Sequence, residues 1–290
     1  MTKLYQKLIK KCPTEAEIKK GLKPAYSNIS GVLDRDLLVN ILSVIDLTSL
    51  NTTDNRTRIL HFTGKVNSFH AKFDDIPNVA AICIYPNFVP IVHEKLTARK
   101  VRIAAVAGAF PSAQTFRSIK VAECKMAADA GADEIDLIIS VGAFLGNDFA
   151  YVADEIREIK EVIGDVQLKI IIESGLLNNH EQIFKASMIA MDAGADFIKT
   201  SSGKTNVSAT PDAAYVMCKA ISGFYSETGI RVGFKAAGGI VTSGDAAIYR
   251  NIVNNVLGED WLDSSLFRIG ASRLANNILS DILGIRTDHF

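Results

Sequence analysis

AMDAGADFIKT, residues 190–200, repeats a pattern that appears 63 residues earlier in the chain as AADAGADEIDL, residues 127–137. The two segments align without a gap, and their separation is the length of two β-α units. In each, a glycine (Gly131 or Gly194) can take the left-handed conformation that ends a helix, and an aspartate two residues later leads into a strand. The repeat therefore predicts alternating helices and strands. Chance reuse of a good helix-to-strand loop is an alternative, and it predicts the same strand positions.

Short apolar runs rich in β-branched residues recur from residue 40 onward. Their near-continuous hydrophobicity is typical of parallel strands that are buried on both faces. Longer amphipathic segments, such as 116–131 and 179–194, lie between them and predict helices. The eight runs are 41–47, 79–85, 101–107, 134–140, 166–172, 196–200, 230–235 and 266–271.

Eight strands that alternate with helices favour a closed α/β barrel, the (β/α)8 TIM barrel, over an open sheet, and about 250 residues suffice for one. We therefore expect a barrel catalytic domain over residues 41–290. Residues 1–40 contain little Gly or Pro and predict an N-terminal helical extension. We expect this extension to pack on the outside or the bottom of the barrel.

The composition is that of an ordinary soluble globular protein, with 48% apolar and 22% charged residues among 290. Acidic and basic residues balance at 32 each, so the net charge indicates neither a nucleic-acid partner nor a membrane partner. The basic start of the chain lacks an apolar run of signal-peptide length, and no stretch approaches the ~18 apolar residues of a membrane helix. These features predict a cytoplasmic protein.

Cysteine and histidine spacing gives no sign of a metal centre. The four cysteines form no CxxC pair, and the five histidines show no HxH or HExxH pattern. We therefore expect reduced thiols and no metal held by the protein. The cysteines are Cys12, Cys83, Cys124 and Cys218.

Four strand ends carry a charged residue on runs that are otherwise apolar. They are Asp46, Asp136, Lys199 and Lys235. In eight-stranded barrels the carboxyl ends of the strands form the active site. The repeat places Asp136 and Lys199 at equivalent heights on the fourth and sixth strands, where we expect them to be neighbours across the interior. The alternative is that these charges form structural ion pairs.

Two lysines in one pocket suggest Schiff-base chemistry. A free lysine has a pKa near ~10.4, so its amine is protonated and not nucleophilic at neutral pH. A second ammonium group nearby and partial desolvation lower such a pKa and free the lone pair. Lys199, Lys235 and Asp136 can then serve as nucleophile, electrostatic neighbour and proton carrier, although the pattern does not decide which lysine attacks. Lys169 is either an accessory charge in the pocket or a partner of Glu173.

Turns rich in small residues follow the last three predicted strands. They are SSGK (201–204), AAGG (236–239) and GASR (270–273). Glycines let backbone N–H groups approach an anion, and the phosphate sites of barrels commonly follow strands seven and eight. The turns therefore predict a phosphorylated substrate.

Several of these segments resemble the deoxyribose-phosphate aldolase family, whose members are class I aldolases on the barrel fold. FIKTSSGK (197–204) and VGFKAAGG (232–239) are the most specific, and the resemblance extends from about residue 40 to residue 284. The other matching segments are IDLTSL (45–50), AAICIYP (80–86), ADEIDL (132–137), LKIIIESG (168–175), ATPDAA (209–214) and LFRIGAS (266–272).

The resemblance implies that Lys199 forms the Schiff base, with Asp136 and Lys235 as its catalytic partners. It also implies that Asp46 and Thr48 line the pocket. The implied phosphate-binding residues are Ser202, Gly203, Lys204, Gly238, Gly239, Gly270 and Ser272.

The implied reaction is the reversible cleavage of 2-deoxy-D-ribose 5-phosphate to D-glyceraldehyde 3-phosphate and acetaldehyde, with neither a metal nor an organic cofactor. The resemblance also implies a homodimer. A related Schiff-base aldolase or transaldolase on another phosphosugar is an alternative, as is a catalytically silent phosphosugar-binding homologue. The presence of Asp136, Lys199 and Lys235 together argues against the silent homologue, since a mere binder needs only the glycine turns.

Three residues depart from the family pattern. Ala236 stands where members usually have a proline, and Arg273 stands where many have a small or hydroxyl residue. The chain ends in Phe290, whereas some members end in a tyrosine that reaches the site. The last two departures bear on phosphate binding and proton transfer, and they leave the reaction class unchanged.

Overall fold

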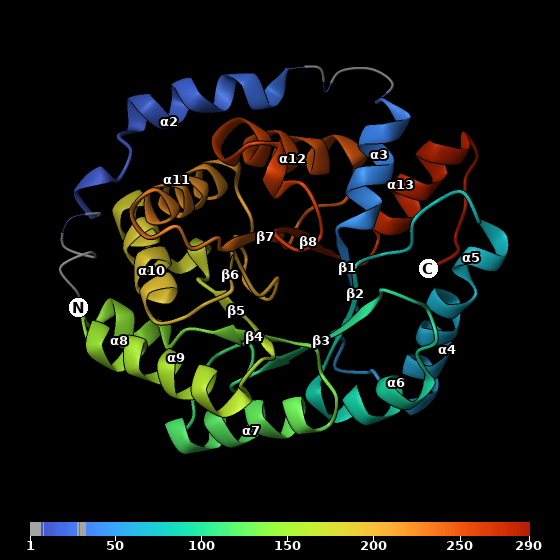
Figure 1. The fold of residues 1–290 in the computed structure, drawn as a ribbon, viewed down its shortest axis with the longest axis horizontal. Coiled ribbons are helices and arrows are strands. Elements are labelled where there is room, and N and C mark those ends of the chain that lie inside the picture. Colours follow the sequence, from blue (N-terminus) through green and yellow to red (C-terminus); the bar gives the residue numbers. More distant parts are fainter. Residues whose placement is uncertain (1–6, 8, 28, 30–32) are drawn as a thin grey trace.

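Eight parallel strands close into a barrel ringed by helices (Figure 1). The computed structural model describes residues 7, 9–27, 29 and 33–290. The strands are β1 (Ile45–Thr48), β2 (Ala81–Ile84), β3 (Arg102–Ala107), β4 (Glu134–Ile138), β5 (Gln167–Ile171), β6 (Phe197–Lys199), β7 (Gly233–Ala237) and β8 (Phe267–Ala271). Each strand pairs with the next one in sequence, and β8 pairs with β1 to complete the closure. The (β/α)8 fold predicted from the sequence is confirmed.

Two of the strands, β1 and β7, begin at least three residues later than the apolar runs predict. Residues 41–43 form the last turn of α3 (Arg35–Ser43), and β1 starts only at Ile45. Residues 230–232 precede β7, which instead continues to Ala237. A short apolar run can form a buried helix end or a buried loop as well as a strand, so hydrophobicity alone does not place these boundaries.

Helices that follow the strands cover the outer face of the barrel and bury apolar side chains against it (Figure 1). They are α4 (Arg56–Asn67), α5 (Phe69–Lys72), α6 (Val89–Lys95), α7 (Arg117–Asp129), α8 (Val141–Leu145), α9 (Phe149–Ile163), α10 (His180–Asp192), α11 (Pro211–Thr228), α12 (Ser243–Leu257) and α13 (Leu274–Leu283). Single 3-10 turns occur at η3 (Pro86–Phe88), η4 (Ser174–Leu176) and η5 (Glu259–Trp261). In the described part of the chain, no helix is both long and apolar enough to cross a lipid bilayer.

The described part of the first forty residues is mainly helical. It forms η1 (Ile9–Lys11), α2 (Glu15–Leu22), η2 (Lys23–Tyr26) and most of α3. A capping box between Thr14 and Glu17 begins α2, which packs on α11, while η2 and α3 pack on α12 (Figure 1). The predicted domain boundary between residues 40 and 41 falls inside α3, and the division into an extension and a barrel domain stays a prediction. Residues 1–6, 8, 28 and 30–32 of the predicted extension lie outside the described residues.

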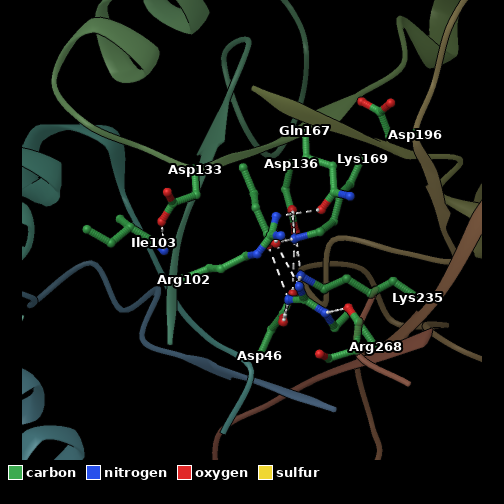
Figure 2. Close-up of polar contacts among 12 residues, drawn as sticks. Asp46, Arg102, Ile103, Asp133, Asp136, Gln167, Lys169, Asp196, Lys235 and Arg268 are labelled. Atoms are coloured by element: carbon green, nitrogen blue, oxygen red, sulfur yellow. Dashed lines mark hydrogen bonds and ion pairs between the residues drawn. The ribbon is translucent and has the colours of Figure 1, made fainter. Parts of the chain in front are cut away.

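The two helix-to-strand loops of the repeated pattern have the same structure. Gly131 and Gly194 have φ angles of +103° and +102°, a region that glycine enters most readily. Asp133 and Asp196 each accept, at Oδ2, a hydrogen bond from a backbone N–H of the preceding strand, at 2.8 and 2.7 Å (Figure 2 shows the first of these bonds). The repeat therefore encodes one loop, which holds β4 against β3 and β6 against β5.

Alanine at the two glycines tests this loop. Gly194→Ala should lower the free energy of unfolding by about 1–2 kcal/mol, because a side chain at positive φ is strained. The added Cβ would be in ordinary contact with Lys160, at 3.5 Å. Gly131→Ala should be more destabilising, because there the Cβ would lie 2.5 Å from Nδ1 of His93. Urea unfolding curves measure both changes, and equal losses would show that the His93 ring moves aside without cost.

Candidate active site

Seven buried charged side chains meet inside the barrel, and Figure 2 shows most of them. None is more than 3% exposed. They are Asp46 from β1, Glu134 and Asp136 from β4, Lys169 from β5, Lys199 from β6, Lys235 from β7 and Arg268 from β8. A buried charge is costly unless it is paired, so the interior is stable only if each of these groups finds an opposite charge.

Asp136 lies between the two lysines that the sequence associates with it. Its Oδ2 accepts a hydrogen bond from Nζ of Lys199 and another from Nζ of Lys235, each at 2.7 Å. The two lysines are register partners on β6 and β7, and Asp136 reaches them from β4. The other oxygen, Oδ1, has no hydrogen bond from the described chain, and Nζ of Lys169 lies 3.4 Å from it. The structure thus brings together the three residues expected to be catalytic.

A second set of ion pairs lies nearer the amino ends of the strands. Nζ of Lys169 contacts Glu134 and lies 3.3 Å from Asp46. Arg268 donates to Glu134 from Nη2 at 2.7 Å and to Asp46 from Nη1 at 2.5 Å, and Lys235 also contacts Asp46. These carboxylates are bound by cationic side chains, and no group of His, Cys, Asp or Glu in the described residues is arranged to hold a metal ion.

The ion pairs oppose burial in setting the pKa values of these groups. Burial alone would raise the pKa of Asp136, but Lys199, Lys235 and Lys169 hold it well below its ordinary range. The pKa of Asp46 is lowered against burial in the same way, by Lys169 and Lys235 foremost. Burial would lower the pKa of Lys235, but Asp136 and Asp46 raise it. At neutral pH both acids are therefore ionised and Lys235 keeps its proton.

A cavity of about 300 Å³ opens at Lys199, at the carboxyl ends of the strands. Its wall includes Thr48, Ser202, Gly203, Lys204, Gly238, Gly239, Gly270 and Ser272, together with Arg273. The residues implied for the phosphate therefore lie around one space. Asp46 does not belong to the wall of this cavity, contrary to the expectation that it lines the pocket. It is fully buried below the cavity, where Lys235 and Arg268 bind it.

Close packing of two turns shapes the wall of this cavity. Gly203 and Gly238 have φ angles of +76° and +87°. A Cβ on Gly238 would lie 2.5 Å from Cβ of Ser208 and 3.1 Å from Cα of Gly203, so a larger residue does not fit. The hydroxyl group of Ser201 donates to the carbonyl of Ala237 at 2.6 Å and joins the ends of β6 and β7. The turns are therefore held close enough to present their backbone groups to one ligand.

Glu173 holds the first of these turns in position. Its Oε1 accepts hydrogen bonds from the backbone N–H of Ser202 at 3.1 Å and from the hydroxyl of Thr205 at 3.4 Å. The backbone of Glu173 has a φ of +53°, which turns the chain away from the direction of β5. The Glu173 carboxylate therefore does not continue the row of side chains on the inward face of that strand. The pairing of Lys169 with Glu173 is therefore wrong, and Lys169 is instead an accessory charge of the buried network.

Glu134 and Arg268 are not among the residues that the sequence motifs single out. Both lie inside predicted strands, Glu134 two positions before Asp136 and Arg268 two positions before Gly270. Strand side chains alternate between the two faces, so a spacing of two was the signal that could have placed both inside the barrel.

The three departures from the family pattern lie in different places. Ala236 is buried within β7. Arg273 is exposed at the wall of the cavity. Phe290 stacks on Phe69 with ring centroids 5.2 Å apart, and it lines a neighbouring cavity rather than the one at Lys199.

A lysine amine beside a carboxylate and a second ammonium group, at the carboxyl end of a β/α barrel, is typical of enzymes that form Schiff bases with carbonyl substrates. The amide-rich cavity next to it suits a small anionic substrate. The family model described as DeoC/LacD family aldolase matches residues 41–259. The chain therefore belongs to this family of aldolases.

Relatives from several organisms match most of the chain. A Caenorhabditis elegans protein is 36% identical over 268 residues, which are 92% of this chain and 88% of its own. The deoxyribose-phosphate aldolase of Homo sapiens is 37% identical over 254 residues, which are 83% of this chain and 79% of its own. A solved structure, the tetrameric deoxyribose phosphate aldolase of Aeropyrum pernix, shares the fold with a TM-score of 0.66 at 20% identity, covering 92% of this chain and 98% of that one.

Replacement of Lys235 tests whether its charge tunes the neighbouring amine. Lys235→Met keeps a similar apolar stem, and Asp46 and Asp136 keep Lys169 as a cationic neighbour, so the fold should persist. The rate at neutral pH should fall by several orders of magnitude. Loss of electrostatic tuning predicts partial recovery toward about pH 9 or 10, because alkaline solution favours the neutral amine that attack on a carbonyl requires.

Lys235→Arg is the matched control, because it keeps the positive charge and should retain more activity near neutral pH. Profiles of rate against pH measure the difference between the two variants. A flat profile for Lys235→Met would reject electrostatic tuning and leave Lys235 with proton transfer alone.

Proposed function

We propose that the chain reversibly cleaves 2-deoxy-D-ribose 5-phosphate to D-glyceraldehyde 3-phosphate and acetaldehyde through a Schiff base on Lys199. The observation that carries the proposal is the position of the Lys199 amine. It lies 2.7 Å from the Asp136 carboxylate, and Lys199 lines the cavity formed by the amide-rich turns. The human relative, 37% identical, bears the name of this activity.

The contacts of the two lysines support Lys199 as the nucleophile. Nζ of Lys235 is held by both Asp46 and Asp136, and Lys235 is fully buried with a raised pKa. Lys199 has Asp136 as its ion-pair partner and reaches the cavity surface. A substrate that enters the cavity therefore meets the amine of Lys199.

The chemistry follows from the carbon skeleton of the substrate. Attack of the Lys199 amine on the C1 aldehyde and loss of water give a protonated imine. Removal of the proton from the C3 hydroxyl breaks the C2–C3 bond, whose electron pair passes toward the imine. The three-carbon aldehyde phosphate departs, and an enamine remains on Lys199. Protonation of the enamine at C2 and hydrolysis release acetaldehyde and restore the amine.

Asp136 is the base that we propose for the C3 hydroxyl. Its Oδ2 binds both ammonium groups, whereas Oδ1 accepts no hydrogen bond from the described chain and lies 3.4 Å from Nζ of Lys169. Because Asp136 is fully buried and outside the cavity wall, the proposed route to the substrate hydroxyl is through a water molecule. Lys235, which keeps its proton at neutral pH, lies 2.7 Å from the same carboxylate and completes the relay that returns a proton to C2. Proton transfer of this kind contributes about 10²- to 10⁴-fold to a rate.

The substrate phosphate is proposed to lie among the glycine turns. The two turns approach each other at Gly203 and Gly238, and residues without a side chain let backbone N–H groups come close to an anion. Ser272 and Arg273 precede α13, so a hydroxyl, a guanidinium group and the positive end of a helix add to the same wall.

The homodimer and the cytoplasmic location stay predictions. The tetramer is a property of the Aeropyrum pernix protein, and at 20% identity that likeness extends to the fold alone.

Borohydride reduction in the presence of acetaldehyde tests the choice of nucleophile. The imine should be reduced to a stable ethyl adduct on Lys199, which peptide mapping by mass spectrometry can locate. Lys199→Arg is the control and should take up no adduct. An adduct confined to Lys235 would reverse the two roles.

Arg273→Ser tests the proposed phosphate site. A hydrogen bond to a charged group is worth about 1.5–3 kcal/mol, and Arg273 is exposed, so KM for the phosphorylated substrate should rise about tenfold, the lower end of that range. The reaction of unphosphorylated 2-deoxyribose should hardly change. An equal effect on both substrates would exclude Arg273 from the phosphate site.

A further inference from the structure

A second cavity, of about 360 Å³, adjoins the cavity at Lys199. Thr48, Asn51, Ser272 and Arg273 belong to the walls of both. The two spaces therefore meet on the side where the substrate phosphate is proposed to lie. Volumes of this size are typical of small-ligand sites.

Three cationic side chains line the second cavity. Helix α4 contributes Arg58 and Lys65, and a spacing of seven residues places them on one helical face together with His61. Arg273 faces them from the turn before α13. The acidic residue of the described wall is Asp288, which already accepts a hydrogen bond from an asparagine of α13 at 2.9 Å.

The charges of this wall are largely uncompensated. The guanidinium group of Arg273 and the ammonium group of Lys65 have no hydrogen bond or ion pair within the described chain. Nε of Arg58 lies 3.6 Å from Asp54, but the Arg58 side chain is 55% exposed, and such exposed contacts are weak. Several cations held around one space repel one another, and an anion that enters the space relieves this repulsion.

We propose that the second cavity is an anion subsite that receives the terminal phosphoryl group of a diphosphate-bearing ligand. The inner phosphoryl group would occupy the site among the glycine turns, with Arg273 in the wall shared by both. The proposal rests on the proposed function, because it takes that phosphate site as the first anchor. It extends the ligand class from monophosphate esters of a small sugar to diphosphates.

Binding of inorganic pyrophosphate and inorganic phosphate to the full chain, measured by calorimetry, tests the subsite without relying on catalysis. Pyrophosphate should bind about tenfold more tightly than phosphate, which corresponds to about 1.4 kcal/mol. Lys65→Gln and Arg58→Gln should each weaken pyrophosphate binding about fivefold, the upper range for an exposed charge pair, and leave phosphate binding unchanged. Arg56→Gln is the matched control, since Arg56 is exposed on the same helix but outside the wall.

Any one of three results would overturn the proposal. Pyrophosphate could bind no more tightly than phosphate, or the Lys65 and Arg58 variants could bind pyrophosphate as tightly as the unchanged protein. The third result is that these variants lose affinity for both anions equally. Cleavage of 2-deoxy-D-ribose 5-phosphate gives a separate readout. Competitive inhibition by pyrophosphate that Lys65→Gln relieves would support the subsite. Absence of cleavage, with pyrophosphate binding still sensitive to Lys65→Gln, would reject the proposed function and retain the subsite.

Discussion

The ion pairs inside the barrel are the constraint on which the rest of the structure depends. Three carboxylates and four cationic groups are buried there, with at most 3% exposure each. Loss of one partner from a buried pair typically costs about 3–5 kcal/mol, so each strand has to deliver its charge at the correct height. The parallel register does this by aligning Lys199 with Lys235 on adjacent strands, while Asp136 reaches both from β4.

The buried charges of the interior have two roles: some hold the strands together, and others form part of the candidate active site. Arg268 and Glu134, near the amino ends of the strands, bind each other and do not line the cavity. Lys199 lies at the other end of the network and reaches the cavity wall. The network fixes the protonation of Asp136 and Lys235, whose pKa values are moved in opposite directions by their mutual attraction. The glycine turns add a site for a negative group without adding another buried charge.

Much of this arrangement could be predicted from the sequence, because the determining patterns are local. The repeated helix-to-strand loop fixes the phase of β4 and β6, and that phase brings Asp136 and Lys199 together. The start of β1 could not be predicted, because residues 41–43 are equally suited to the end of a helix. The place of Asp46 could not be predicted either, since its cationic partners lie 123, 189 and 222 residues further along the chain and no local pattern contains them.

These separations have a consequence for how the chain acquires its structure during synthesis. The first strand leaves the ribosome with a carboxylate whose partners do not yet exist, and the last of them, Arg268, arrives with the eighth strand. A barrel that lacked the eighth strand would enclose Asp46 without its full complement of cations, so that carboxylate favours a hydrated, open arrangement until Arg268 is present. Long-range pairing of this kind slows folding and makes closure cooperative. The ion pairs of Asp46 can therefore be complete only in the closed barrel, in which β8 lies beside β1.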